Sequence, residues 1–335
     1  MAAFILRRML QLVFVLWGGA TLLFFLFYTL PNSPAQLIAS SRGNRNPNPQ
    51  VVKNLERKLG LDKSIPVQYV HYMDHLVHGD LGTSYATGAS VVSIAKDDLP
   101  HSLRLAFWAI LLEAWAGIAG GMLSARRRNS LGDYFTTIAA VLAGAVPVFV
   151  LGLLIQQVTG ITAYQHSWPA WARFPVLGYG PDRWLFATFP LGHTWKYLFE
   201  PTIVLASVST AIIARITRTS MLETMRQDHV RTARAKGLRE RRVMRRHVLR
   251  NALVPVVTIL GVDFGTLVGA AILTESVFGL HGLGSQIVNS AQIQDLPVVL
   301  GLTLIVTLIY GVASLAVDIS YALLNPRVRL GSIAS

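Results

Sequence analysis

Three histidines and one aspartate in a short segment come closest to the spacing of a metal site. His71, His75 and His78 stand with Asp74 in the stretch HYMDHLVHGD. Histidines four positions apart lie on one face of a helix and can share a metal ion. A metal-bound imidazole usually donates its other ring N–H to a carboxylate or carbonyl, and the sequence singles out no such partner. The alternative is a solvated helix face, and we expect no metal here.

Two acidic residues stand in strongly apolar surroundings, where a charge is costly. Glu113 lies in AILLEAWAG and Asp263 in ILGVDFGT. A carboxylate at the centre of a bilayer costs at least about 2.5 kcal/mol if it faces lipid. Both side chains are therefore expected to face protein or water. Two roles stay open for them: a structural hydrogen bond, or a position on a path that a polar solute takes across the membrane.

The sequence contains no residue pattern that is typical of an enzyme. Cysteine is absent, which excludes thiolate metal sites and cysteine nucleophiles. The glycine-rich stretch GLHGLG, residues 279–284, lacks the lysine and the preceding strand of a phosphate-binding loop. Neither a Ser-His-Asp set nor a pair of carboxylates has a spacing that indicates catalysis. We expect no enzyme activity, no cofactor and no bound ATP on this chain.

The composition indicates a membrane protein. Apolar residues make up 52% of the 335 residues and charged residues only 14%, whereas about 25% of an ordinary soluble domain is charged. The apolar residues fall into blocks of about 20, the length that crosses the hydrocarbon core of a bilayer. An all-helical membrane fold with six spans follows, at residues 9–30, 105–123, 134–158, 201–216, 254–273 and 296–317.

The distribution of positive charge orients these spans. Lys and Arg number 30 against 17 Asp and Glu, a net charge of +13. Many of them fall in short connections on one side of the membrane, such as Arg126 to Arg128 and the stretch 215–250. Short cytoplasmic loops collect Lys and Arg, so both termini are predicted to be cytoplasmic. The charge needs no nucleic acid to explain it, although anionic lipid would suit it.

The chain divides into four regions. Residues 1–30 form an N-terminal tail and the first span, and residues 31–100 form a large external loop. Residues 101–329 form a core domain with five spans and a cytoplasmic loop at 221–253, followed by a tail at 330–335. Within the external loop, apolar residues at helical spacing predict a short surface helix at 50–59.

The cytoplasmic loop carries the most specific pattern in the chain, HVRTARAKGLRERRVMRRHVLRNALVP. Good helix formers precede Gly237, and glycine commonly closes a helix in the left-handed conformation. Met244 and Val248 then stand four positions apart between arginines. The pattern predicts a short helix, a sharp turn and an amphipathic helix lying across the membrane surface. Pro255 marks where the next span begins or bends.

At these residues the sequence resembles the permease subunits of ABC importers, and most of all the B-type half of the dipeptide and oligopeptide permease pair. The loop motif reads ARAKGL followed by RHVLRNALVP. Further matches are RRMLQLVFVLWGGATLLFFLFYTLPNSPA and ILTESVFGLHGLGSQIVNSAQIQDLPVVLG. The resemblance covers residues 7–329 and is weakest at 159–196. It implies the six-helix fold of a type I ABC importer permease.

The resemblance also implies that this loop, the EAA loop of the family, docks its first short helix in a cleft of a cytoplasmic ATPase. The general motif has Glu where Arg231 stands, and of the two alanines that follow in the motif only Ala233 agrees. A small-residue helix from Ala233 to Ala235 would let the partner approach closely. The implied coupling residues are Arg231, Thr232, Ala233, Arg234, Ala235, Lys236, Gly237 and Leu238.

By the same resemblance, the chain is a non-catalytic subunit in a bacterial plasma membrane. It would pair with a second homologous permease, while two cytoplasmic ATPase domains use ATP and Mg²⁺ and an external binding protein delivers the cargo. The expected cargo is a di- or oligopeptide, with nickel, haem, glutathione or another small solute as alternatives. Glu113 and Asp263 are then candidates for the translocation path, where they would meet a peptide's amino group.

Other classes of membrane protein explain less of the sequence. A stand-alone channel or carrier would leave the cytoplasmic loop unexplained. A membrane enzyme would need titratable groups that converge at one depth, and Glu113 with Asp263 is the one pair the sequence offers. A plain basic helix on the lipid surface would account for the arginines but not for the alanine-rich turn before Gly237.

Overall fold

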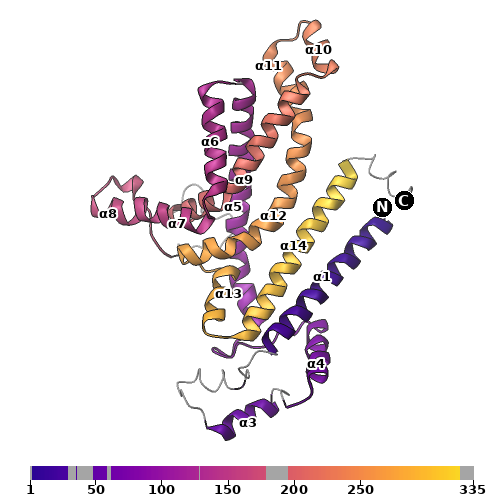
Figure 1. The fold of residues 1–335 in the computed structure, drawn as a ribbon, viewed down its shortest axis with the longest axis vertical. Helices are drawn as coiled ribbons and strands as arrows, with labels where there is room; N and C mark the ends of the chain where they lie inside the picture. The colour runs from indigo at the N-terminus through magenta and orange to yellow at the C-terminus, as the bar shows by residue number, and fades with distance from the viewer. Residues whose placement is uncertain are drawn as a thin grey trace.

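The computed structural model describes residues 2–28, 35, 48–58, 62–127, 129–178 and 195–324 (Figure 1). Within these ranges the chain is helical apart from turns and one isolated bridge between Thr83 and Ser90. The main helices are α1 (Ala2–Tyr28), α3 (Pro49–Lys58), α4 (Ile65–Val77), α5 (Val91–Arg126), α6 (Leu131–Ala145), α7 (Val148–Ile155), α8 (Ala163–Gln165), α9 (Trp195–Thr224), α10 (Asp228–Ala235), α11 (Glu240–Arg242), α12 (Arg250–Phe278), α13 (Leu283–Gln292) and α14 (Leu296–Leu324).

Six helical segments among the described residues are long and apolar enough to cross a membrane, which confirms the predicted all-helical fold with six spans. Their bounds are Ile5–Leu26, Val91–Arg126, Val148–Gln165, Trp195–Thr224, Glu240–Phe278 and Leu296–Val317. Helices α5, α6, α9 and α12 run side by side, and α1 lies along α14 (Figure 1). The short helix predicted at 50–59 is also present, as α3.

The third predicted span, 134–158, is wrong as one continuous helix. Helix α6 ends at Ala145, Val146 is extended with φ −90° and ψ 126°, and α7 begins after Pro147. Proline disfavours the helical conformation in the residue before it and has no N–H of its own, so the helix breaks here. Helix α7 then leaves α6 at a steep angle (Figure 1), and the apolar segment that qualifies as a span is Val148–Gln165.

The amphipathic helix after Gly237 is also placed differently from the prediction. It does not lie as a separate helix across the membrane surface, because α11, a π-helical turn at Val243–Leu249 and α12 form one continuous helical segment. Pro255 lies inside α12 rather than at its start. The arginine-rich stretch is therefore an extension of the fifth span, so a force on it acts directly on that span.

Helices α5 and α9 pack so closely that two glycines are required on α5. A Cβ atom on Gly117 would come within 2.6 Å of the Ile213 side chain, and one on Gly121 within 2.5 Å of Thr217 Cβ. Small residues four positions apart let helix backbones approach closely inside a membrane, where interhelical packing replaces the hydrophobic effect. The α5–α9 pair therefore forms a rigid centre for the bundle.

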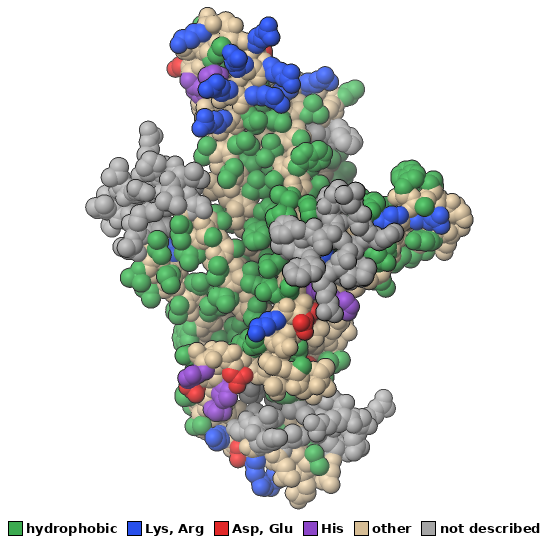
Figure 2. Space-filling view, turned by 180° about the vertical axis from the view of Figure 1, so that it is seen from behind, with side chains coloured by type: hydrophobic (Ala, Val, Ile, Leu, Met, Phe, Trp, Pro, Cys, Tyr) green, Lys and Arg blue, Asp and Glu red, His purple; other side chains and the backbone are tan. Residues whose placement is uncertain are grey.

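The surface divides into two polar ends and an apolar middle. Lys and Arg side chains gather at the end that carries α10 and α11, and green apolar side chains cover the middle of the molecule (Figure 2). Helices α3 and α4 lie at the opposite end (Figure 1). Exposed apolar side chains of α1, such as Leu10 and Phe14, belong to this apolar surface.

Candidate functional site: the turn around Gly237

The turn at residues 228–238, here called the α10 turn, has the predicted form of a short helix closed by glycine. Gly237 has a φ of +74°, the left-handed conformation that disfavours side chains with a Cβ. Its N–H donates to the Arg234 carbonyl at 2.9 Å, and the Leu238 N–H donates to the Ala233 carbonyl at 3.4 Å. These bonds satisfy carbonyls that the end of a helix leaves free.

The α10 turn presents most of its predicted coupling residues to solvent, with one exception. Val230 and Ala233 are buried, with Ala233 only 5% exposed, in a cluster that includes Met221, Val243 and Met244. The expectation that Ala233 faces a partner is therefore wrong, because its small side chain lets α10 pack on this chain's own helices. The exposed residues are Arg231, Thr232, Arg234, Ala235, Lys236 and Gly237, and Leu238 is half-buried.

An ion pair bridges the two sides of Gly237. The Arg234 guanidinium donates to Glu240 from Nη2 at 2.8 Å and from Nε at 3.1 Å. The hydrogen bonds to Glu240 raise the pKa of Arg234. Two parallel N–H···O bonds fix direction as well as distance, so the pair holds the end of α10 against α11.

Arginines surround the turn on its α11 side. They line an open cavity of about 590 Å³ next to Gly237. Together with the exposed cations of α10 they form a strongly positive surface, which favours an acidic partner or anionic lipid. The lining residues are Gly237, Leu238, Arg239, Arg241, Arg242, Arg245 and Arg246.

A partly buried ion pair ties together the helices that carry the turn. Arg218 of α9 donates to Asp133 of α6 from Nε at 2.8 Å and from Nη2 at 2.9 Å. Asp133 is 5% exposed and also accepts hydrogen bonds from the Ser124 hydroxyl of α5 and the Asn129 N–H. The hydrogen bonds from Arg218 and Ser124 hold the pKa of Asp133 far below its ordinary value. No sequence pattern indicates this pair, because its members are 85 positions apart.

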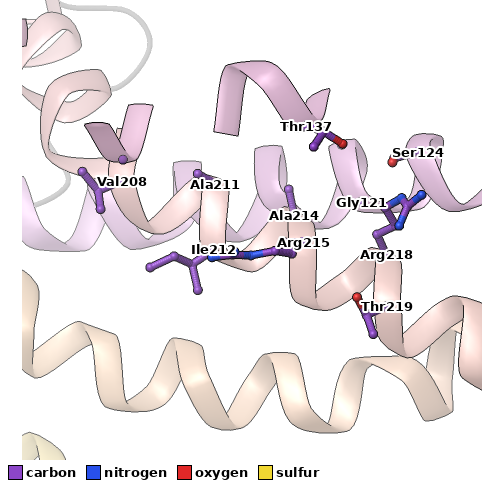
Figure 3. A pocket seen from close by; sticks show the side chains of 12 residues that line it. Gly121, Ser124, Thr137, Val208, Ala211, Ile212, Ala214, Arg215, Arg218 and Thr219 are labelled. Atoms are coloured by element: carbon purple, nitrogen blue, oxygen red, sulfur yellow. The ribbon is translucent and has the colours of Figure 1, made fainter. Parts of the chain in front are cut away.

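A groove of about 600 Å³ opens between α5, α6 and α9 beside this ion pair. Figure 3 shows its α9 side, where Ala211, Ala214 and Arg215 lie along the same helix as Arg218. Gly121 and Ser124 of α5 line it as well. The groove is mostly apolar, and its Ser124 and Arg218 side chains are the ones that hydrogen-bond to Asp133.

The structure brings the two predicted path residues together. Glu113 of α5 is fully buried, and its carboxyl group is close enough to interact with Asp263 of α12 and Ser209 of α9. Neither Glu113 carboxylate oxygen makes a well-formed hydrogen bond to the described part of the chain. Asp263 is partly exposed, and one of its oxygens accepts a hydrogen bond from Thr266. Three helices therefore converge on one acidic site.

Two more buried carboxylates accept hydrogen bonds from loops at the other end of the molecule. Glu275 accepts a hydrogen bond from the Gly284 N–H at 2.8 Å, and a Cβ on Gly282 would lie only 2.5 Å from its carboxyl group. The glycines of GLHGLG thus make room for a carboxylate. Asp295 accepts hydrogen bonds from the Tyr85 N–H at 2.9 Å and from the Ser84 hydroxyl, which fixes the segment between α4 and α5 to the start of α14. Both roles depend on tertiary contacts that the sequence pattern does not show.

The histidine segment forms the last part of α4 and the residues directly after it. His71 and His75 lie together there, and His78 points to a different partner. His71 and His75 face each other with their Nε2 atoms 3.2 Å apart. His78 instead pairs with Asp74, 3.6 Å from its carboxylate. Within the described residues no three His, Cys, Asp or Glu side chains are arranged to hold a metal. Asp318 lies in the last part of α14, and its side chain is outside the described residues.

Two family models match the chain. The model described as the binding-protein-dependent transport system inner membrane component matches residues 117–330. A model for the N-terminal part of the same type of membrane component matches residues 1–106. A solved structure titled as an amino acid ABC transporter with histidines aligns with a TM-score of 0.50 and 17% identity, over 70% of this chain and 94% of that chain. That likeness supports the fold.

Several named proteins match the chain over nearly its full length. The dipeptide transport system permease protein of Alkalihalophilus pseudofirmus is 36% identical over 98% of this chain and 100% of its own. The protein of the same name from Escherichia coli K12 is 36% identical over 98% and 99%. The glutathione transport system permease protein of Pectobacterium atrosepticum is 34% identical over 98% and 99%.

These matches confirm the resemblance to ABC importer permeases that the loop motif predicted. They also make the chain a multi-pass membrane component of a transport system rather than an enzyme. The chain belongs to the family of inner-membrane components of binding-protein-dependent transport systems, the permease subunits of ABC importers.

Proposed function

We propose that the chain forms half of a translocation path for di- or oligopeptides and that the α10 turn docks on a cytoplasmic ATPase. In this proposal a second homologous permease supplies the other half, and an external binding protein delivers the cargo. ATP and Mg²⁺ belong to the two partner ATPase domains. The observation that carries the proposal is the exposed α10 turn with its glycine closure, at the end of an extended fifth span.

The connection between the turn and the membrane explains how docking would move the path. Helix α9 leads into the α10 turn, and α11 continues through α12 into the bundle. A partner that shifts the turn therefore acts on two spans at once, as a rigid-body switch requires. Because the Asp133–Arg218 pair joins α6 to α9, α6 would follow the same motion.

The acidic site at Glu113 and Asp263 is the proposed contact for the cargo's amino group. A buried carboxylate without hydrogen bonds is unfavourable, and a passing ammonium group would relieve that cost. We expect Glu113→Gln to lower the maximal rate of peptide uptake by the assembled importer while the chain stays folded in the membrane. Uptake at the wild-type rate would show that Glu113 and Asp263 do not contact the cargo.

Names of the relatives favour a peptide as cargo. Two of them are named for dipeptide transport and one for glutathione, itself a small peptide. Uptake of labelled dipeptide and labelled glutathione, each in competition with the other unlabelled, measures which one the importer prefers. Uptake of neither, in membranes where the full complex is assembled, would contradict a peptide cargo.

The proposed orientation places the α10 turn and both termini in the cytoplasm. The chain has no cysteine, so single cysteines can be introduced as labels. Ala235→Cys marks the α10 turn, and Val77→Cys, at a position that is 84% exposed on α4, marks the opposite end. A membrane-impermeant maleimide added to intact spheroplasts should label only Val77→Cys. Labelling of Ala235→Cys alone would mean the reverse orientation.

Capture of partners tests the docking directly. We expect the tagged chain in mild detergent to bring down a second permease and an ATPase, identified by mass spectrometry. Lys236→Glu, at an exposed position directly after α10, should recover less ATPase but the same amount of permease. Lys63→Glu, exposed at the opposite end of the molecule, is the matched control and should recover both. Recovery of the chain alone after crosslinking would favour a stand-alone channel or carrier.

A further inference from the structure

A pocket at the end of the molecule opposite the α10 turn, lined by both apolar and polar side chains, contains two histidines in a specific arrangement. The pocket has a volume of about 430 Å³ and lies between α4, the segment after it and the start of α14. His71 and His75 line it together with Asp80. Side chains of His75 and Asp80 are 45% and 55% exposed, so a small ion can reach them from solvent.

The distance between the two imidazoles suits a shared metal ion. Their Nε2 atoms are 3.2 Å apart, and the rings are nearly perpendicular, with centroids 4.4 Å apart. Two imidazole nitrogens bound to a tetrahedral Zn²⁺ at about 2.0–2.1 Å lie about 3.3–3.4 Å from each other. The helix supplies this geometry because His71 and His75 are one turn apart on the same face of α4.

Asp80 provides the outer partner that a metal-bound histidine needs. Its Oδ2 atom lies 2.8 Å from Nδ1 of His75, and its Oδ1 atom accepts a hydrogen bond from the Gly82 N–H at 2.9 Å. When Nδ1 of His75 donates to Asp80, the lone pair lies on Nε2, and in the metal-free chain it accepts the hydrogen bond from His71 Nε2. A metal would replace that hydrogen bond once the His71 proton moves to its Nδ1. This carboxylate–histidine arrangement orients a metal ligand and makes it more basic.

We propose that His71 and His75 bind a divalent transition metal such as Zn²⁺, with Asp80 as the positioning residue behind His75. Imidazole ligands suit Zn²⁺, Cu²⁺ and Ni²⁺ and do not suit Mg²⁺ or Ca²⁺. With two protein ligands, the remaining positions are open to water or an anion. Arg57 and Lys63 line the same pocket, and their positive charge favours an anion as the added ligand while it opposes the binding of the metal cation itself.

The site would fix the external segment that follows α4. Asp80 joins His75 to the Gly82 backbone, and two residues later Ser84 bonds to Asp295 at the start of α14. A metal on His71 and His75 would therefore stiffen a chain of contacts that runs from α4 to the last span. This proposal concerns this chain alone and does not depend on the cargo or on the ATPase contact.

Zinc titration of the full chain tests the proposal. The chain is purified in detergent through a tag without histidine, freed of metal with a chelator, and titrated with Zn²⁺ in a calorimeter in the presence of excess Mg²⁺. We expect about one Zn²⁺ per chain. His71→Ala and His75→Ala should each abolish this binding, and Asp80→Asn should weaken it about 10- to 100-fold.

His78→Ala is the matched control, because His78 lies on the same segment but pairs with Asp74. It should bind Zn²⁺ as the wild type does. Thermal unfolding of the metal-free proteins should be the same for all variants, and Zn²⁺ should raise the midpoint of the wild type and His78→Ala only. Wild-type binding no tighter than that of His71→Ala, or an equal loss in His78→Ala, would overturn the proposal.

Discussion

Arg234 and Glu240 form two hydrogen bonds, at 2.8 and 3.1 Å, across the left-handed turn at Gly237. The pair lies at the surface, where a bidentate ion pair contributes at most about 1 kcal/mol to stability. Its effect is on geometry, because it sets the angle between α10 and the helical segment that leads into α12. The position of the α10 turn is thus fixed from outside by this pair and from inside by the packing of Ala233.

Substitutions at two alanines of α10, one buried and one exposed, distinguish an effect on folding from an effect on docking. Ala233→Arg would place a charge in a buried cluster and should cost about 4 kcal/mol or more in stability. Ala235→Arg changes an exposed position and should leave the thermal unfolding midpoint unchanged. It should nevertheless weaken association with the ATPase by about 2 kcal/mol, or about thirtyfold. Normal ATPase binding by a folded Ala235→Arg protein would contradict the docking proposal.

Because of the left-handed turn, the effect of a substitution at position 237 depends on the backbone preference of the new residue and not on its size. A Cβ at this position would meet no atom within 4 Å, but the φ of +74° is unfavourable for residues other than glycine and asparagine. Gly237→Val should destabilise the turn by about 1–2 kcal/mol and lower substrate-stimulated ATPase activity. Gly237→Asn should retain most of that activity. Equal activity of the two variants would mean that this backbone conformation is not needed for coupling.

The close α5–α9 contact predicts opposite outcomes for two adjacent glycines. Gly121→Ala would bring a methyl group within 2.5 Å of the Ala214 carbonyl oxygen and should cost about 1–3 kcal/mol. Gly120→Ala has 3.9 Å to its nearest neighbour, so it should be neutral or slightly stabilising through helix propensity. Thermal unfolding of both variants in detergent measures the difference. The same midpoint for both would show that the helices can move apart without loss.

The Asp133–Arg218 pair predicts a pH-dependent contribution to stability. Asp133→Asn should cost about 1.5–3 kcal/mol at neutral pH, because it removes charged hydrogen bonds to a buried site. The pKa of Asp133 is lowered in the folded chain. Its ionised form therefore stabilises the fold fully above the unfolded pKa of about 3.9, and this contribution is lost as the pH falls further.

Unfolding midpoints of the wild type and Asp133→Asn, measured from pH 7 to pH 3, test this sign. Their difference should be constant between pH 7 and about pH 5 and should shrink below about pH 4. A difference that grows on acidification would contradict the assignment of a paired, ionised Asp133.

Periodic features of the sequence predicted much of the fold. The apolar blocks indicated the six spans, and Gly237 indicated the end of α10, because both depend on local propensity and length. The break at Pro147 was missed, although Pro147 was visible, because the apolar run continues on both sides of it. The burial of Ala233 could not be read from its neighbours, since it depends on how α10 packs against residues such as Val243 and Met244.

The sequence could not show which side chains of the sites lie next to each other, because tertiary contacts decide this. Glu113 and Asp263 were predicted one by one from their apolar surroundings, and their proximity comes from the packing of α5 against α12. Asp80 follows His75 by five positions, yet its hydrogen bond to the imidazole depends on the turn after α4. Which side chains form hydrogen bonds depends on the path of the backbone, and the spacing of residues in the sequence does not determine that path.

Site-specific crosslinking from the α10 turn tests the central claim most directly. Ala235→Cys in the otherwise cysteine-free chain carries a photoactivatable label in membranes that contain the assembled importer, and Val77→Cys is the matched control at the opposite end. We expect a crosslink to an ATPase subunit from Ala235→Cys and none from Val77→Cys. No ATPase crosslink from Ala235→Cys, with the complex shown to be intact, would contradict it.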